Sequence, residues 1–351
     1  MGLPVSGKVM LALQALPLGC AKCGGRLLAV HSDNSEITLH FAASFLETNM
    51  KALQLAQQEG SSKMREARRA YRTLLIETLL EARRMQSDAR QDMIPFSVTA
   101  YHLTNSGQGA DLDIYHLPMQ LVEFLREVNW ADNRQEWLTI VNRAWEIEPP
   151  KKGHKESAEP FEPRRNYLYE DLFLLPDKAP HFVRTYFLRW PLRRARNDLS
   201  DPRRDYSPRS ETQLVCWNIT AIFLRRILYM NPDRVEQIRN LGDRLAEYVR
   251  SQNDRRFLRS FFNARYPDHL RTILIRANTS CIYAGNSPLF GLDSYVSVFD
   301  EGEELARTDW RLARDLVLIR MIEKLYEVKW LGEHPDAMPD SSEDETETET
   351  E

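Results

Sequence analysis

An arginine-rich segment in the middle of the chain has the residue types that bind nucleic acid. Between His181 and Glu211, eight arginines face four acids, with aromatic residues interleaved. Guanidinium groups contact phosphate through paired hydrogen bonds, and aromatic faces stack on unpaired bases. The residues expected to contact nucleic acid, including a lysine pair upstream, are Lys151, Lys152, Arg189, Arg193, Arg194, Arg196, Arg203, Arg204 and Arg209. A solvated helix face with its rings turned inward is the alternative, because charge runs usually lie in water.

A polar loop between two strand-like runs is the second candidate contact. It consists of Asn105, Ser106, Gly107, Gln108 and Gly109. Two glycines among small and amide side chains let another backbone approach closely, so a protein or a nucleic acid could bind there. As a bare turn, the loop requires no function, and both interpretations stay open.

Acidic residues that could support metal-dependent catalysis are few. Asp111 and Asp113 form a D-x-D pair, and Glu146 and Glu148 precede a lysine, a pattern seen in some nucleases. Such short acid pairs are more often solvated turn or surface residues. The phosphate-binding, metalloprotease and serine-hydrolase motifs are absent from the sequence. We therefore predict a protein that is not an enzyme, with metal-dependent nuclease activity as an alternative.

The four cysteines do not complete a metal site. Cys20 and Cys23 have the spacing of half a zinc knuckle, but Cys216 and Cys281 are single and lie in apolar helical patterns. We predict no metal site and no cofactor. Cysteines this scattered also favour a reducing, cytoplasmic location over a disulfide framework.

Charge is distributed unevenly along the 351 residues. Eight acids and no bases follow His334, so the formal net charge of −4 leaves +4 for the rest of the chain. The acidic end has too few apolar residues for a core, and residues 335–351 are predicted to be disordered. The longest apolar stretch, 214–230, contains an arginine pair, which favours a buried helix over a membrane span.

Hydrophobic periodicity predicts a mainly α protein with a small β-hairpin element and a C-terminal helical bundle. The hairpin is expected at 94–117, around the polar loop. Helices are expected at 7–16, 36–58, 63–86, 118–128, 134–145, 179–197, 232–250, 254–264, 267–283 and 308–330, with a short strand at 27–30. A Pro- and Lys-rich stretch suggests a domain boundary. We therefore expect an α+β domain at 1–150, a linker or mobile segment at 151–178 and the bundle at 179–334.

Three segments resemble a known family. GLPVSGKVMLALQALPLGCAKCGGRLLAVHSD, IPFSVTAYHLTNSGQGADLDIYHLP and SETQLVCWNITAIFLRRIL are similar to the large subunit of type I CRISPR Cascade complexes, in the MYXAN, Cst and Cmx branch. The resemblance spans roughly residues 2–330. In that family the first segment follows an N-terminal region, so the chain is expected to lack that region.

The resemblance implies function through binding. It implies a non-catalytic subunit that joins crRNA, target DNA and other Cascade subunits, recruits a separate helicase-nuclease and has no membrane partner. Guide pairing would carry sequence identity, leaving the protein to hold the displaced strand and the duplex by shape and charge. A purely structural scaffold, in which the basic segment meets acidic proteins, is the remaining alternative.

Overall fold

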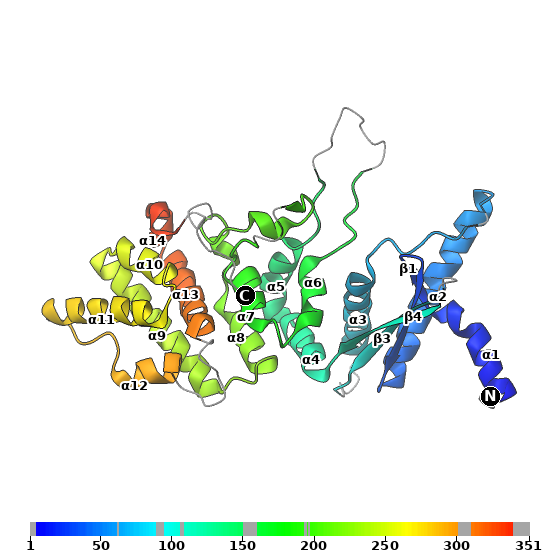
Figure 1. The fold of residues 1–351 in the computed structure, drawn as a ribbon, viewed down its shortest axis with the longest axis horizontal. Coiled ribbons are helices and arrows are strands. Elements are labelled where there is room, and N and C mark those ends of the chain that lie inside the picture. The colour runs from blue at the N-terminus through cyan, green and yellow to red at the C-terminus, as the bar shows by residue number, and fades with distance from the viewer. Residues whose placement is uncertain are drawn as a thin grey trace. The chain divides into compact units, whose positions relative to one another are not determined.

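The chain folds into two compact units, shown in Figure 1. The computed structural model describes residues 5–61, 63–88, 95–105, 109–149, 160–192, 195, 197–300 and 310–339. The first unit comprises Met1–Trp130 and Trp145–Leu174, and the second comprises Ala131–Ala144 and Leu175–Glu351. The mainly α fold class with a small antiparallel sheet is confirmed.

The first unit is built on a four-stranded antiparallel sheet in the order β1-β2-β3-β4. The predicted hairpin is β3 and β4, and the predicted short strand at 27–30 lies within β2, which pairs with β3. Gly24 and Gly25 have φ of 59° and 77°, so they form the tight turn between β1 and β2. The elements are α1 (Gly7–Ala15), η1 (Leu16–Gly19), β1 (Ala21–Cys23), β2 (Arg26–Ser32), α2 (Ser35–Gln58), α3 (Tyr71–Asp88), β3 (Val98–Asn105), β4 (Ala110–Leu117), α4 (Met119–Val128), α6 (Tyr167–Asp171) and η2 (Leu172–Leu174).

Residues alternate between the two faces of this sheet. Leu28, Val98 and Ala100 point to one face and are buried. On that face His102 stacks on Tyr71 of α3, with ring centroids 4.6 Å apart. The sheet and its helices therefore form one core in this unit.

The prediction of a linker or mobile segment at 151–178 is wrong for its second half. Residues 151–159 lie outside the described residues, but α6 follows and buries Tyr167, Leu168 and Tyr169. The N–H of Asn166 donates to Thr73 Oγ1 at 3.0 Å, which joins this stretch to α3. The Pro- and Lys-rich sequence upstream predicted a linker, but the aromatic residues of α6 form a short helix because they pack into the core.

The second unit is helical, and its first helix was predicted for the other domain. Its elements are α5 (Ala131–Asn142), α7 (Ala179–Phe182), η3 (Val183–Phe187), η5 (Pro202–Asp205), η6 (Thr212–Leu214), α8 (Trp217–Arg226), α9 (Pro232–Gln252), α10 (Arg255–Phe262), α11 (Pro267–Tyr283), α12 (Leu292–Tyr295), η7 (Val296–Asp300), α13 (Trp310–Glu327), α14 (Trp330–Glu333) and η8 (Pro335–Ala337). Because α5 packs here with α8, this unit begins before the expected boundary at 150. Among the described helices, none combines the length and apolar character required to cross a membrane.

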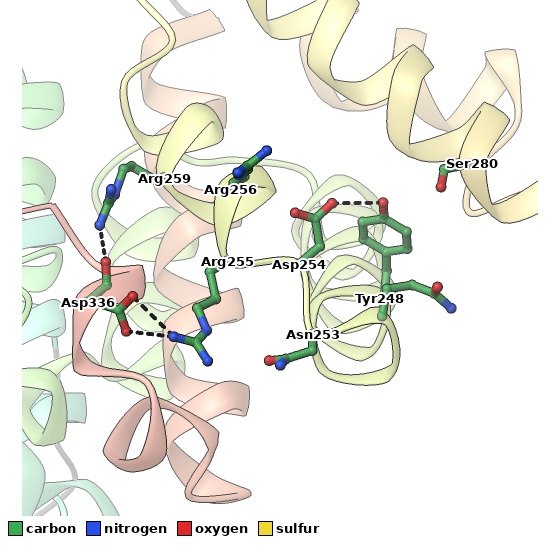
Figure 2. A pocket seen from close by; sticks show the side chains of 9 residues that line it. Tyr248, Asn253, Asp254, Arg255, Arg256, Arg259, Ser280 and Asp336 are labelled. Atoms are coloured by element: carbon green, nitrogen blue, oxygen red, sulfur yellow. Dashed lines mark hydrogen bonds and ion pairs between the residues drawn. The ribbon is translucent and has the colours of Figure 1, made fainter.

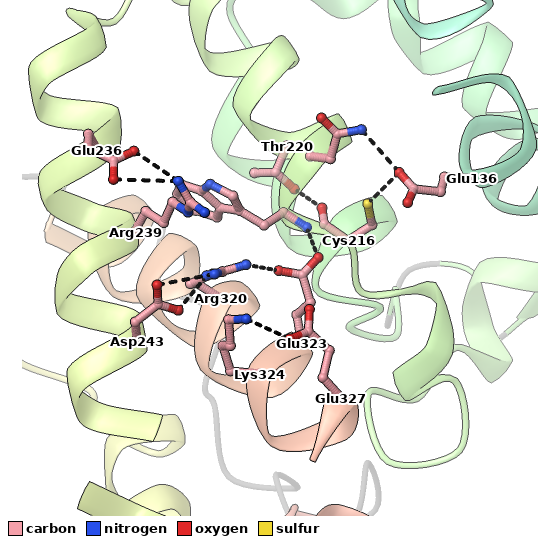
Figure 3. A network of polar contacts seen from close by, with 12 residues as sticks. Glu136, Cys216, Thr220, Glu236, Arg239, Asp243, Arg320, Glu323, Lys324 and Glu327 are labelled. Carbon is pink, nitrogen blue, oxygen red and sulfur yellow. Dashed lines mark hydrogen bonds and ion pairs between the residues drawn. The ribbon is translucent and has the colours of Figure 1, made fainter. Parts of the chain in front are cut away.

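Helix α13 lies at the centre of the second unit, and its residues 312–322 are all buried. Its Arg320 is buried as well and donates to Asp243 Oδ1 at 2.6 Å and to Glu323 Oε2 at 2.5 Å (Figure 3). Glu323 also accepts the backbone N–H of Trp217 at 2.9 Å. This network ties α13 to α9 and to the start of α8.

The close contact between α9 and α13 depends on Gly242. A Cβ on Gly242 would lie 2.7 Å from Cβ and 2.8 Å from Cγ of Arg320. Arg320 cannot move aside without losing its carboxylate partners.

We expect Gly242→Ala to lower the free energy of unfolding by about 1–3 kcal/mol, as overpacking does. Urea denaturation followed by circular dichroism measures this, with Gly332→Ala as control because no atom lies within 4 Å of a Cβ there. Equal stability of the two variants would contradict the overpacking argument.

The prediction of a disordered tail at 335–351 is wrong for its first residues. Residues 335–337 form η8, and Ala337 and Met338 are buried. Residues 340–351 lie outside the described residues. The start of the acidic stretch is therefore part of the folded second unit.

Candidate nucleic-acid interface

Arg189 is fully buried, so its predicted contact with nucleic acid is wrong. Its Nε and Nη2 donate to Glu211 Oε2 at 2.9 and 2.8 Å. Its guanidinium also lies 3.5 Å from the ring centroid of Tyr206, which is itself buried. The Arg189 guanidinium therefore stabilises the core through a buried ion pair and ring stacking, and it is not accessible to a phosphate in solvent.

Among the described residues of the arginine-rich segment, further arginines pair with carboxylates. Arg203 donates to Asp201 at 2.6 Å with 12% of its side chain exposed, and Arg204 donates to Asp205 at 3.0 Å. Arg209 is exposed, whereas Arg193, Arg194, Arg196, Lys151 and Lys152 lie outside the described residues. The rings Tyr186, Phe187, Trp190 and Tyr206 are buried, as the alternative interpretation proposed.

The predicted helix at 179–197 is wrong for its second half, because the continuous helical structure that begins at Ala179 ends at Phe187. Helix α7 has four residues, and η3 adds a wide π turn before the chain becomes irregular. Arg189 then adopts a positive φ of 61°. Local periodicity suggested a solvated helix, but aromatic burial folds this stretch into the core.

The polar loop and the acid pairs offer no assembled active site in the described part of the chain. Asn105 ends β3 and Gly109 precedes β4, while Ser106, Gly107 and Gln108 lie outside the described residues. Asp111 and Asp113 both bind Arg26, at 2.7 and 2.8 Å. Glu146 accepts the backbone N–H of Arg164 at 2.8 Å. Asp111, Asp113 and Glu146, which were considered as nuclease residues, therefore bind groups of the protein itself. Among the described residues, no group of three possible metal ligands occurs.

The two cysteines of the CAKC motif are buried in the first unit. Cys20 and Cys23 are 1% and 3% exposed. Burial raises the pKa of the Cys23 thiol to about 11, with a smaller raising effect from the nearby Glu66 carboxylate, and burial also raises the pKa of Cys20. Both thiols are therefore protonated at neutral pH and pack as small apolar groups.

An open positive surface occurs on α10 and α11 instead. Residues 255–292 contain six arginines and one acid, Asp268. On α10, the buried side is Phe257, Leu258, Phe261 and Phe262. That spacing leaves Arg255, Arg256 and Arg259 on the opposite side of the helix.

A polar pocket of about 520 Å³ adjoins these arginines (Figure 2). It is lined by Tyr248, Gln252, Asn253, Asp254, Arg255, Arg256, Arg259, Ser280 and Asp336. Arg255 Nη1 donates to both carboxylate oxygens of Asp336 at 3.2 Å, and Arg259 donates to the Asp336 carbonyl. The Arg255 guanidinium holds the pKa of the Asp336 carboxyl below its usual range. A protein carboxylate is thus already bound in this arginine cluster.

Helix α11 extends the positive surface beyond the pocket. Arg276, Ser280 and Tyr283 follow one another at one-turn spacing, so they share a face of α11, and Ser280 lines the pocket. Arg276 is exposed and Tyr283 is 87% exposed. We define the arginine surface as Arg255, Arg256, Arg259, Arg276 and Tyr283. Within the described residues, no ion-pair partner is found for Arg256 or Arg276.

Sequence reasoning treated these helices only as members of the bundle. The signal that would have found the surface is local charge balance, because only one acid occurs between Asp254 and Asp293. The segment at 181–211 has four acids for its eight arginines. Because α10 and α11 carry so few acids, their arginines depend on carboxylates elsewhere in the chain, and within the described residues no ion-pair partner is found for Arg256 or Arg276.

Comparison of the chain with protein-family models, with curated proteins and with solved structures finds no match.

Proposed function

We propose that this protein binds nucleic acid through the arginine surface and does not cleave it. The observation that carries the proposal is the 520 Å³ pocket, in which arginines of α10 surround a polar space and already hold a carboxylate. An anion in that place meets several guanidinium groups at once, and guanidinium groups bind phosphate, like carboxylate, through paired hydrogen bonds.

A strand fits this surface better than a small anion does. Arg276 and Tyr283 lie about one turn to either side of Ser280 on α11, so a strand at the pocket could contact Arg276 as well as the arginines of α10. The exposed ring of Tyr283 provides a platform on which an unpaired base can stack. Because none of these contacts reads base edges, binding should depend little on sequence.

A more specific proposal assigns the protein to a type I CRISPR surveillance complex as a non-catalytic subunit in the cytoplasm. Its support is the resemblance of the three segments quoted above, to which the comparisons add nothing. In that setting the arginine surface would hold displaced DNA or duplex backbone while guide pairing selects the target. The partners would be crRNA, target DNA and the other Cascade subunits.

Salt-dependent binding tests the general proposal. We expect a fluorescent 20-nucleotide single strand to bind at 50 mM salt, with a log–log salt slope of about −3 if four arginines each neutralise a phosphate. Magnesium should produce no cleavage of the strand. Absence of binding at 50 mM salt, or a slope near zero, would refute the proposal, and cleavage lost on Asp113→Ala would favour the nuclease alternative. Binding of an acidic peptide but not of the strand would favour the scaffold alternative.

A further inference from the structure

Helix α1 is apolar almost all round and yet buries nothing. Only Lys8 and Gln14 are polar among GKVMLALQA, apart from the initial glycine, and none of its residues is buried. Leu11 and Leu13 are 68% and 57% exposed. A helix of this character is normally buried in a core, and the part of the chain that the structure describes provides no surface that covers it.

The neighbouring helix α2 carries an exposed apolar stripe with heptad spacing. Leu39, Ala43, Leu46, Met50 and Leu53 follow one another at steps of four, three, four and three residues. All five are exposed, from 38% at Leu46 to 70% at Leu39. We call these five residues the α2 seam. At about 100° per residue, the seam lies roughly 160° round the helix from the buried Ile37, Phe41 and Phe45.

The residues beside the α2 seam are nearly free of charge. One flank is His40, Glu47 and Gln54, and the other is Ala42, Asn49 and Ala56. Glu47, the acid among them, already pairs with Lys51 at 2.6 Å. Two identical seams could therefore meet without like-charge repulsion.

The exposed residues of η1 lie beside the seam. Asn49 Nδ2 donates to the carbonyl oxygens of Leu18 and Cys20 at 3.3 and 2.8 Å. A Cβ on Gly19 would lie 3.2 Å from Ala42 Cβ, which shows how closely η1 packs on this flank. Leu16 and Leu18, 43% and 58% exposed, thus extend the apolar surface from α2 toward α1.

We propose that a second copy of this chain covers the surface, through a parallel coiled coil of the two α2 helices along the α2 seam. The heptad assigns Leu39, Leu46 and Leu53 to the d positions, where parallel two-stranded coiled coils carry leucine, and Ala43 and Met50 to the a positions. Within the 24-residue helix, the α2 seam from Leu39 to Leu53 provides about two heptads of contact. The neutral flanks favour a second copy over a strongly charged partner helix.

Oligomeric state tests this inference, independently of nucleic-acid binding. Analytical ultracentrifugation of the whole chain between 1 and 100 µM is expected to show a dimer. Leu53→Glu should weaken dimerisation by at least about 100-fold, because it places two facing charges in an apolar seam. Leu55→Glu is the matched control, since Leu55 is 46% exposed on the same helix, close to the 50% of Leu53, but faces away from the seam.

Crosslinking tests the parallel arrangement. Leu53→Cys should form a disulfide between copies under mild oxidation, whereas Leu55→Cys should not, and the four native cysteines are buried. Circular dichroism of each variant checks that it is folded. A monomer at 100 µM, a dimer insensitive to Leu53→Glu, or equal loss with Leu55→Glu would overturn the proposal. A dimer that Leu53→Glu disrupts but Leu53→Cys fails to crosslink would overturn the parallel arrangement.

Discussion

Replacing Arg189 with alanine is expected to lower the free energy of unfolding by about 3–5 kcal/mol, because it leaves a buried carboxylate without its main partner. Glu211 is 8% exposed and accepts two hydrogen bonds from Arg189. Arg143 binds the other carboxylate oxygen but is itself one-third exposed, so it cannot compensate fully. The Tyr206 ring also loses the guanidinium stacked on it.

Arg239→Ala is the control for this measurement. Arg239 is 44% exposed and pairs with Glu236 one turn away at 3.3 Å. Exposed pairs of this kind contribute about 0.3–0.5 kcal/mol. Urea denaturation should therefore separate the two variants clearly. Equal stability of Arg189→Ala and Arg239→Ala would contradict the burial of Arg189. The arginine-rich segment would then again be a candidate for binding nucleic acid.

Removing three charges from the arginine surface should weaken nucleic-acid binding by on the order of 100-fold. Each lost phosphate contact is expected to reduce the binding free energy by about 1 kcal/mol. The triple variant is Arg256→Ala, Arg259→Ala and Arg276→Ala. These side chains are exposed, so the fold should be retained. The log–log salt slope should become shallower by about 2, at about 0.7 per contact for a single strand.

The control for this variant removes the same charge elsewhere. Arg65, Arg68 and Arg239 are exposed, and each already pairs with a carboxylate, at 2.5, 2.7 and 3.3 Å. Their triple alanine variant should bind the strand almost as tightly as the natural chain. Equal losses in the two triple variants would show that net charge alone drives binding, and would contradict a localised site.

Regular helices were predictable where the apolar spacing is long and uninterrupted. The expected helix at 267–283 is α11 to the residue, and the one at 232–250 is α9 short of its last two residues. Prolines at the start of both helices, and the heptad-like apolar spacing within them, are local signals. Short elements were missed: α6 follows a Pro-rich stretch, and the expected helix at 179–197 contains only α7 and η3. Their form depends on aromatic packing partners far away in sequence.

The sequence alone determined the fold class, the approximate positions of most long helices and the presence of many arginines, because these depend on composition and local periodicity, although the helix expected at 63–86 begins only at Tyr71. Only the tertiary structure decided which arginines are available. Arg189 and Arg256 are the same residue in similarly basic segments, but one is enclosed with Glu211 and Tyr206 while the other faces a polar pocket. The physical reason is that a guanidinium's charge is neutralised by whichever carboxylate the fold brings to it, and that partner can be distant in sequence or, for Arg256, missing from the described residues.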